Sequence, residues 1–243
     1  MAIWNPWRGC KKCSEGCRYC YIHKGDKKRN IDTNNIIKTK DFYQPIEKTK
    51  NGEYKIKTGT VYLCFSTDFL IEEADPWREE VWKMIKQRSE LTFLFLTKRI
   101  ERFQQCIPQD WGEGYENVVV CCTIENQENA DRKLPIFNQL PIKHKCITAQ
   151  PLLEEVNLQP YLKEIELVVV GGESDPKARP LDYDWVLKIR EQCINNKVDF
   201  EFRQCGTYFI KDGKQYHLPV KELTKQARKA NINRKGNNKK ISN

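Results

Sequence analysis

The chain has 243 residues, with 42 Lys or Arg against 33 Asp or Glu, and its formal net charge is +9. A hydrophobic share of 39% and a charged share of 31% are typical of a folded globular protein and exclude fibrous and disordered classes. No apolar run approaches the roughly 20 residues that cross a bilayer, and the first residues lack a signal-peptide pattern. We therefore expect a cytoplasmic protein that does not enter a membrane.

Cysteines give the strongest local signal. The chain contains 11 of them, and an odd number in a long chain favours metal ligation over a disulfide framework. After an expected short strand at residues 2–5, four fall within one short loop: Cys10, Cys13, Cys17 and Cys20. Thiolates at such spacings suit an iron–sulfur cluster or a tetrahedral zinc. The spacing of the last three is that with which radical S-adenosylmethionine enzymes hold a [4Fe–4S] cluster, and a zinc knuckle of all four is the alternative.

Basic residues gather in two segments. Residues 8–29 contain eight Lys or Arg and two acidic residues, and residues 221–243 contain eight Lys or Arg and one acidic residue. Charge gathered in this way indicates a phosphate-bearing partner such as a nucleotide or nucleic acid, and a solvated surface is the alternative. We expect residues 1–220 to form one domain and residues 221–243 to be a flexible basic tail.

The middle of the chain alternates between two patterns. Residues 30–58 are polar and rich in turn formers, which indicates an insertion. Buried-strand runs then recur at 60–66, 91–97, 117–123, 144–149, 166–172 and 198–204, and amphipathic helical stretches lie at 75–89, 98–107, 128–140 and 182–196. This order predicts an α/β fold with parallel strands, as a partial or complete (β/α) barrel. In such a fold the chemistry lies at the carboxyl ends of the strands.

Several different short motifs lie between residue 4 and about residue 206. They are Trp4-Asn5-Pro6, Gly9-Cys10, Gly16-Cys17 with Cys20-Tyr21, Leu96-Thr97-Lys98-Arg99, Glu125-Asn126-Gln127, Pro151-Leu152-Leu153, Gly171-Gly172-Glu173-Ser174, Ala178-Arg179-Pro180, and Gln204 before Gly206. In this order they resemble the phage Gp37/Gp68 family, also called DUF5131, which looks like a divergent branch of the radical S-adenosylmethionine superfamily. The resemblance implies a barrel, a [4Fe–4S] cluster, S-adenosyl-L-methionine and an external electron donor such as a flavodoxin or ferredoxin.

The resemblance leaves the third cluster ligand open. The three cysteines of the family match Cys10, Cys17 and Cys20, whereas the usual superfamily spacing selects Cys13 in place of Cys10. Two departures concern substrate contacts: Gln150 stands where the family tends to carry an acidic residue, and Cys205 where it tends to carry Trp.

The superfamily resemblance implies that residues after the strands contact the cofactor. Ser66 and Asp68 follow the strand at 60–66, where the methionyl ammonium binds in the superfamily. Thr123, Glu125 and Asn126 follow the strand at 117–123 and could bond ribose hydroxyls. Helix caps and turns are the alternative roles for these side chains.

Gly171, Gly172, Glu173 and Ser174 end a further strand. Two glycines at this place would let the backbone approach an adenine or a phosphate closely.

Four basic side chains and one thiol complete the candidate residues. Lys98, Arg99, Arg179 and Arg203 could hold a carboxylate or phosphate of the substrate. Cys121, at the end of a strand, could donate a hydrogen atom to a substrate radical, and a buried structural thiol is its alternative role.

These features together predict an enzyme. We expect a [4Fe–4S] cluster in the 10–20 loop to generate a 5′-deoxyadenosyl radical from S-adenosylmethionine, with a nucleotide or nucleic-acid base as substrate for repair or modification. The alternative is a zinc-stapled nucleic-acid-binding protein without catalytic activity, which would show steep salt-dependent binding.

Overall fold

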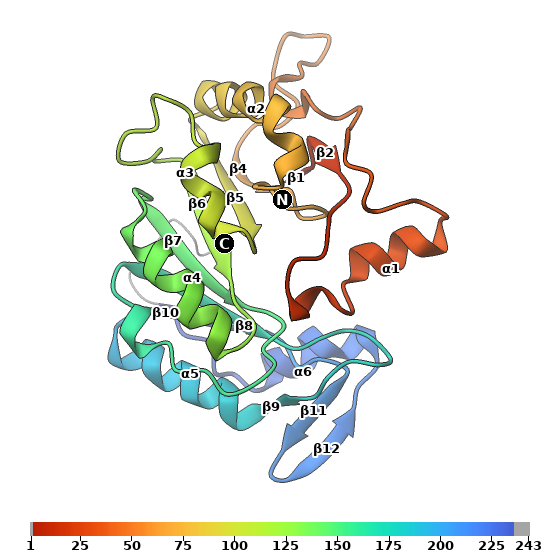
Figure 1. The fold of residues 1–243 in the computed structure, drawn as a ribbon, viewed down its shortest axis with the longest axis vertical. Helices are drawn as coiled ribbons and strands as arrows, with labels where there is room; N and C mark the ends of the chain where they lie inside the picture. Colours follow the sequence, from red (N-terminus) through yellow and green to blue (C-terminus); the bar gives the residue numbers. More distant parts are fainter. Residues whose placement is uncertain (1, 236–243) are drawn as a thin grey trace. The chain divides into compact units, whose positions relative to one another are not determined.

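A computed structural model describes residues 2–235 (Figure 1). The chain folds into two compact units. Unit 1 contains the residues up to Cys13, Ile22–Cys121 and Leu140–His144, and unit 2 contains Ser14–Tyr21, Cys122–Gln139 and the residues from Lys145 onward. The single domain over residues 1–220 remains a prediction from the sequence.

Seven strands form one sheet in the order β1-β4-β5-β6-β7-β8-β10. They are β1 (Ala2–Trp4), β4 (Gly59–Leu63), β5 (Leu91–Thr97), β6 (Val118–Thr123), β7 (His144–Ala149), β8 (Ile165–Gly171) and β10 (Asp199–Gln204). The pairs β1–β4, β4–β5, β7–β8 and β8–β10 are parallel. The order ends at β1 and β10 and does not close. The predicted α/β class with parallel strands is therefore confirmed, in the partial form of the barrel.

Each strand begins within one residue of its expected start. Their runs of Val, Ile, Leu and Phe suit strands that are covered on both faces, and all six residues of β6 are buried. The strand expected at 60–66 ends early, at Leu63, because Cys64 has a φ of 58°. A left-handed residue cannot continue an extended strand.

In unit 1, α2 (Asp75–Gln87) confirms the helix expected at 75–89. Pro76 stands in its first turn, where a missing N–H costs nothing. The helix expected at 98–107 is reduced to the 3-10 turn η4 (Ile100–Arg102) and the four residues of α3 (Phe103–Cys106), and Pro108 follows soon after.

The segment at 30–58 contributes to the core of unit 1. It contains β3 (Ile37–Lys38), which pairs with β2 (Trp7–Arg8), and the 3-10 turn η2 (Gln44–Ile46). Trp4 Nε1 donates to the carbonyl of Phe42 at 3.1 Å, and both side chains are buried. This polar stretch is thus an ordered cover over β1.

In unit 2, α4 (Gln127–Gln139) and α5 (Tyr183–Asn195) confirm the helices expected at 128–140 and 182–196. A second sheet, with the order β12-β11-β9, was not expected. It is made of β9 (Leu181–Asp182), β11 (Tyr208–Lys211) and β12 (Lys214–His217), and β11 and β12 form an antiparallel hairpin (Figure 1).

The segment expected as a flexible tail is ordered through its described part. It contains the 3-10 turn η6 (Val220–Glu222) and the helix α6 (Leu223–Lys229). Leu223 and Ala227, one turn apart, are buried, and Arg234 pairs with Phe200 of β10. The many Lys and Arg residues of this segment favour a flexible tail, and only Leu223 and Ala227 form the apolar face by which the helix packs. Residues 236–243 of the expected tail lie outside the described residues.

Within residues 2–235, none of the helices has both the length and the apolar character needed to cross a membrane.

Candidate functional site

The cysteine loop is divided between the two units. Cys10 and Cys13 belong to unit 1, and Cys17 and Cys20 belong to unit 2. Cys13 is exposed, Cys10 and Cys20 are half-buried, and Cys17 is buried at the end of the 3-10 turn η1 (Glu15–Cys17). Each unit therefore anchors its own part of the loop.

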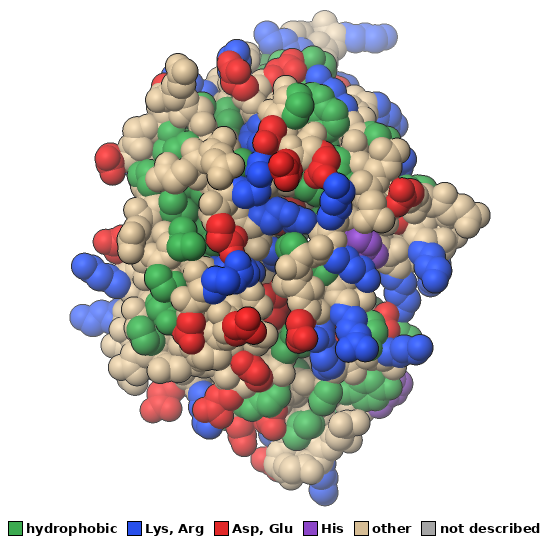
Figure 2. Space-filling model, in the orientation of Figure 1, with side chains coloured by type: hydrophobic (Ala, Val, Ile, Leu, Met, Phe, Trp, Pro, Cys, Tyr) green, Lys and Arg blue, Asp and Glu red, His purple; other side chains and the backbone are tan. Residues whose placement is uncertain are grey.

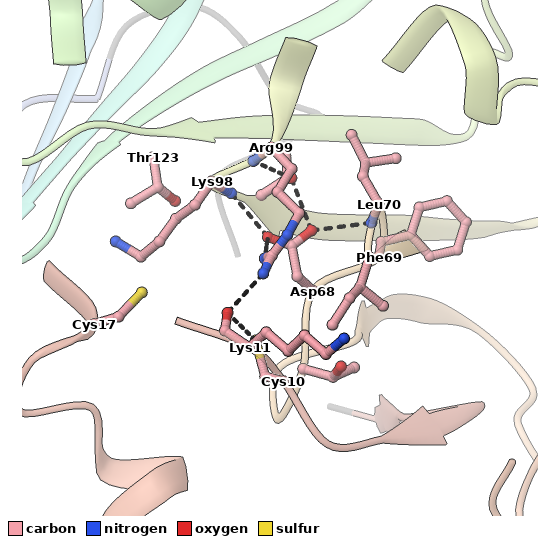
Figure 3. A network of polar contacts seen from close by, with 12 residues as sticks. Cys10, Lys11, Cys17, Asp68, Phe69, Leu70, Lys98, Arg99 and Thr123 are labelled. Atoms are coloured by element: carbon pink, nitrogen blue, oxygen red, sulfur yellow. Dashed lines mark hydrogen bonds and ion pairs between the residues drawn. The ribbon is translucent and has the colours of Figure 1, made fainter. Parts of the chain in front are cut away.

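In unit 1, Asp68 is the centre of a dense polar network (Figure 3). One carboxylate oxygen accepts from the Leu70 N–H at 2.9 Å and the Thr97 hydroxyl at 2.8 Å. The other accepts from the Lys98 N–H and from Arg99 Nη1, each at 3.0 Å. The residue is only 5% exposed. Four internal donors favour the turn role over binding of an external ammonium, since little of the carboxylate is left to accept further hydrogen bonds.

Arg99 links Asp68 to the cysteine loop by hydrogen bonds to both. Its Nη2 donates at 2.6 Å to the carbonyl of Lys11, which lies between Cys10 and Cys13 (Figure 3). Burial disfavours the charged guanidinium, but the negative charges of Asp68, Cys13 and Cys10 outweigh that effect and raise the pKa of Arg99. The side chain predicted to hold substrate thus holds loop backbone in this structure.

Further contacts in unit 1 fix the start of the loop. The N–H of Cys10 donates to the Thr33 carbonyl at 2.7 Å, and the Thr67 hydroxyl donates to the Gly9 carbonyl. Gly9 has a φ of 94°, and a Cβ atom there would lie 2.6 Å from the Asn35 carbonyl oxygen. Only glycine suits this position, because both the backbone conformation and the close approach exclude a side chain.

In unit 2, Glu125 anchors the segment that carries Cys17. The Ser14 hydroxyl donates to Glu125 Oε1, and a Cβ atom on Gly16 would lie 2.6 Å from the Cγ and Oε1 atoms of Glu125. Lys133 Nζ lies 3.8 Å from Glu125 Oε2, and both side chains are fully buried. A buried carboxylate with a buried ammonium beside it is held in place, since separating the two charges would be costly.

A second carboxylate of unit 2 acts through an arginine. Glu173, whose side chain is 5% exposed, accepts from Arg179 Nε at 3.1 Å, from Arg179 Nη2, and from the Arg179 N–H at 2.8 Å. Nη2 also donates to the Glu15 carbonyl at 2.9 Å, two residues before Cys17. The hydrogen bonds with Glu173 raise the pKa of Arg179 against the opposing effect of burial.

The two units thus use the same device. In each, a buried carboxylate after a strand (Asp68 or Glu173) fixes an arginine (Arg99 or Arg179), and the arginine donates to a backbone carbonyl within the cysteine loop. Arg–carboxylate pairs are suited to this because the planar guanidinium can serve two acceptors in a fixed geometry.

Three other residues predicted to contact the cofactor take part in hydrogen bonds within the fold. Asn126 caps α4, since its side-chain oxygen accepts from the Asn129 N–H at 2.9 Å. Thr123 is buried, and its carbonyl accepts from Lys133 Nζ at 3.2 Å. Ser66 is half-buried, and its N–H donates to the side chain of Asn5 at 3.1 Å.

The glycines after β8 allow a close approach within the protein. A Cβ atom on Gly172 would lie 2.8 Å from the carbonyl oxygen of Cys205, and one on Gly171 would lie 3.0 Å from the side chain of Gln150. The glycines therefore admit neighbouring protein atoms, where the sequence suggested an adenine or a phosphate. Ser174 is half-buried beside them.

Two predicted substrate contacts and the predicted hydrogen donor each have local protein surroundings. The side chain of Arg203 pairs with Glu201 at 3.0 Å on the surface. Lys98 contributes its N–H to Asp68, and its side chain is half-buried. Cys121 is 3% exposed, as a structural thiol would be.

Sequence analysis missed several anchoring residues. Ser14 and Gly16 lie among the cysteines, and nothing in the local sequence indicates that they contact Glu125. Lys133 had a usable signal, because it falls beside Ala130, Leu134 and Phe137 on the buried face of α4. A lysine on the apolar face of an amphipathic helix indicates a buried acidic partner.

A comparison with protein-family models matches residues 1–240 to a family described as a protein of unknown function, DUF5131. No curated protein and no solved structure matches the chain.

Proposed function

Because the chain belongs to the DUF5131 family, whose function is unknown, we propose from its own residues that it is a radical S-adenosylmethionine enzyme. The observation that carries the proposal is the cysteine loop: four thiols at short spacings, anchored in each unit by an arginine that a buried carboxylate holds. A solvated loop without a function would not need such anchoring.

The donor set suits an iron–sulfur cluster. Four soft thiol donors fall between residues 10 and 20. Within residues 2–235, no three His, Cys, Asp or Glu side chains are already gathered as a metal-ligand group. Ligation would therefore bring the thiols together while the anchored backbone limits the entropy lost on closing the loop.

Cys17 and Cys20, with Cys10 or Cys13, would hold the cluster. When bound, such a cluster would supply one-electron reduction of S-adenosylmethionine, with a flavodoxin or ferredoxin as the electron source, and so the radical chemistry for removing hydrogen from a substrate. The chain's own residues position the loop: Arg99 fixes the Lys11 carbonyl, and Arg179 fixes the Glu15 carbonyl.

Anaerobic reconstitution tests the proposal. Iron, sulfide and zinc are measured in the full chain, and EPR spectra of the reduced protein are recorded with and without S-adenosylmethionine. We expect about four irons per chain and a signal that S-adenosylmethionine alters. One zinc without iron, and no spectral response, would refute the enzyme and support a zinc-stapled binding protein.

Two matched variants then decide the third ligand. Cys13→Ala keeps the iron content if Cys10, Cys17 and Cys20 are the ligands, and Cys10→Ala keeps it if Cys13 is the third ligand. Retention of iron by Cys17→Ala would contradict both ligand sets.

The basic residues support a nucleotide or nucleic-acid base as substrate. Positive charge in residues 8–29 and 221–235 favours an approach by phosphate groups.

A further inference from the structure

We propose that a pocket of unit 2 binds one nucleotide of a single-stranded nucleic acid, with the base on aromatic rings and the adjoining phosphates at two lysines. The pocket has a volume of about 430 Å³, within the range of roughly 300–1,000 Å³ that small-ligand sites occupy. We call it the aromatic pocket. It is lined by Tyr183, Phe202, Phe209 and Tyr216, with Lys211 and Lys229 among the other lining residues.

Five elements build the aromatic pocket. Tyr183 is the first residue of α5, Phe202 lies on β10, Phe209 and Tyr216 lie on the β11–β12 hairpin, and α6 closes one side. Figure 2 shows hydrophobic side chains on the surface near the bottom of the view, where Figure 1 places this hairpin, with Lys and Arg side chains beside them.

The rings provide a stacking platform. Phe202 and Phe209 are stacked, with ring centroids 6.2 Å apart and an angle of 27° between the planes, and Tyr183 meets Phe209 edge-on at 5.6 Å. Phe202 and Phe209 are buried and hold the platform, while Tyr216 is 44% exposed. An exposed tyrosine ring beside buried phenylalanine rings is suited to stack on a flat ligand, because every nucleobase presents a π-face.

The charge of the lining selects the ligand. Lys211 and Lys229 are exposed, and the lining contains no Asp or Glu. Lys211 Nζ lies 5.5 Å from the centre of the Tyr183 ring, so a cation already stands beside one aromatic face. Aromatic rings with cations and no carboxylate favour a flat anion over a cationic or aliphatic ligand.

A single strand suits this arrangement better than a duplex. In a duplex the bases are stacked and paired, whereas an unpaired strand can turn one base out onto a protein ring. Further cations, Lys214, Lys221 and Arg228, are exposed on β12, η6 and α6 and could meet the phosphates that follow. This inference does not rest on the iron chemistry, because it concerns binding by the chain itself.

Fluorescence anisotropy of a labelled single-stranded oligonucleotide tests the inference on the full chain without cofactor. We expect Tyr216→Ala to weaken binding about tenfold or more, because one base loses its stacking partner, and Tyr216→Phe to bind as the native chain does. We expect Lys211→Gln with Lys229→Gln to weaken binding and to reduce the salt slope by about 1.4, at roughly 0.7 per phosphate contact.

A matched pair of lysines provides the control. Lys163→Gln with Lys197→Gln removes the same charge from exposed positions of unit 2 outside the lining. If both double variants lose affinity equally, or if the native chain does not bind the strand, the inference is overturned. Circular dichroism confirms that each variant is folded.

Two further measurements distinguish the sources of the nucleotide. Crosslinking of a strand that contains 5-iodouracil should modify Tyr216 or Tyr183, and a crosslink elsewhere would contradict the inference. Competition with a free nucleoside monophosphate should need a far higher concentration than competition with the unlabelled strand. Equal potency of the two competitors would show that the pocket binds a free nucleotide and overturn the assignment to a strand.

Discussion

Replacement of Asp68 by Asn tests the anchoring device of unit 1. The carboxylate accepts two hydrogen bonds from backbone N–H groups, one from the Thr97 hydroxyl and one from Arg99. An asparagine keeps one acceptor oxygen, and its NH₂ group would face donors. At least two of the four hydrogen bonds are therefore lost, together with the negative charge beside the guanidinium.

The expected cost follows from burial. The side chains of Asp68 and Arg99 are 6% and 14% exposed. Breaking a buried pair by removal of one partner costs about 3–5 kcal/mol, and Arg99 keeps its bond to the Lys11 carbonyl, which places the expected loss near the lower end, about 3 kcal/mol. That is a large part of the roughly 5–15 kcal/mol by which a domain is stable.

Urea unfolding followed by tryptophan fluorescence measures this loss in the full chain. Glu53→Gln is the control, because Glu53 and Lys57 form an ion pair whose side chains are 63% and 69% exposed. We expect the control to change the free energy of unfolding by less than about 1 kcal/mol. Hydrogen exchange at the Leu70 and Lys98 amides should accelerate in Asp68→Asn. A loss no larger than that of the control, with unchanged exchange, would refute the role given to Asp68.

Three other predictions concern packing, pH and thiol reactivity. Gly16→Ala should destabilise the chain and lower metal binding, because its Cβ atom would lie 2.6 Å from the fully buried side chain of Glu125. Gly25→Ala is the control: it lies in the helix α1 (Tyr21–Lys28), and the nearest atom to its Cβ would be 3.9 Å away. In thermal melts we expect this control to raise the stability by about 0.5–1 kcal/mol. Burial raises the pKa of Asp75, but hydrogen bonds from Arg78 and Arg102 outweigh it and lower the pKa. The carboxylate therefore contributes stability above about pH 4, and this contribution is lost at lower pH. In urea titrations the stability difference between the native chain and Asp75→Asn should shrink from pH 5 to pH 2, and a constant difference would contradict this. Iodoacetamide should modify the exposed Cys13 first, and Cys205 should stay unmodified in the folded metal-free chain, because burial raises its pKa to about 12; early modification of Cys205 by mass spectrometry would be the contrary result.

The sequence by itself determined the strands and the longer helices. The run at 118–123 consists of β-branched residues and cysteines that are all buried, a composition typical of a strand covered on both faces. The helix at 75–87 was visible because Pro76 and the acidic residues near it mark a helix start, and the apolar spacing continues behind them. Four cysteines within one loop also predict a metal site from composition alone, since thiols are soft metal ligands in any fold.

The roles of the charged residues were decided only by tertiary structure. Arg99 and Arg179 donate to carbonyls that lie 88 and 164 residues away in the chain. From the sequence, a basic residue after a strand could hold a substrate or a loop equally well. The choice depends on which groups long-range folding brings within hydrogen-bond distance, and neither periodicity nor composition records that.

The aromatic pocket and the ordered end of the chain follow the same rule. Phe202, Phe209 and Tyr216 belong to three strands, and Tyr183 begins a helix, so their shared pocket exists only once β10 and the β11–β12 hairpin meet α5 and α6. Local sequence fixes which residues alternate along a strand. Which faces then pack together is settled by the burial of apolar area across the whole chain, and that is a property of the tertiary fold.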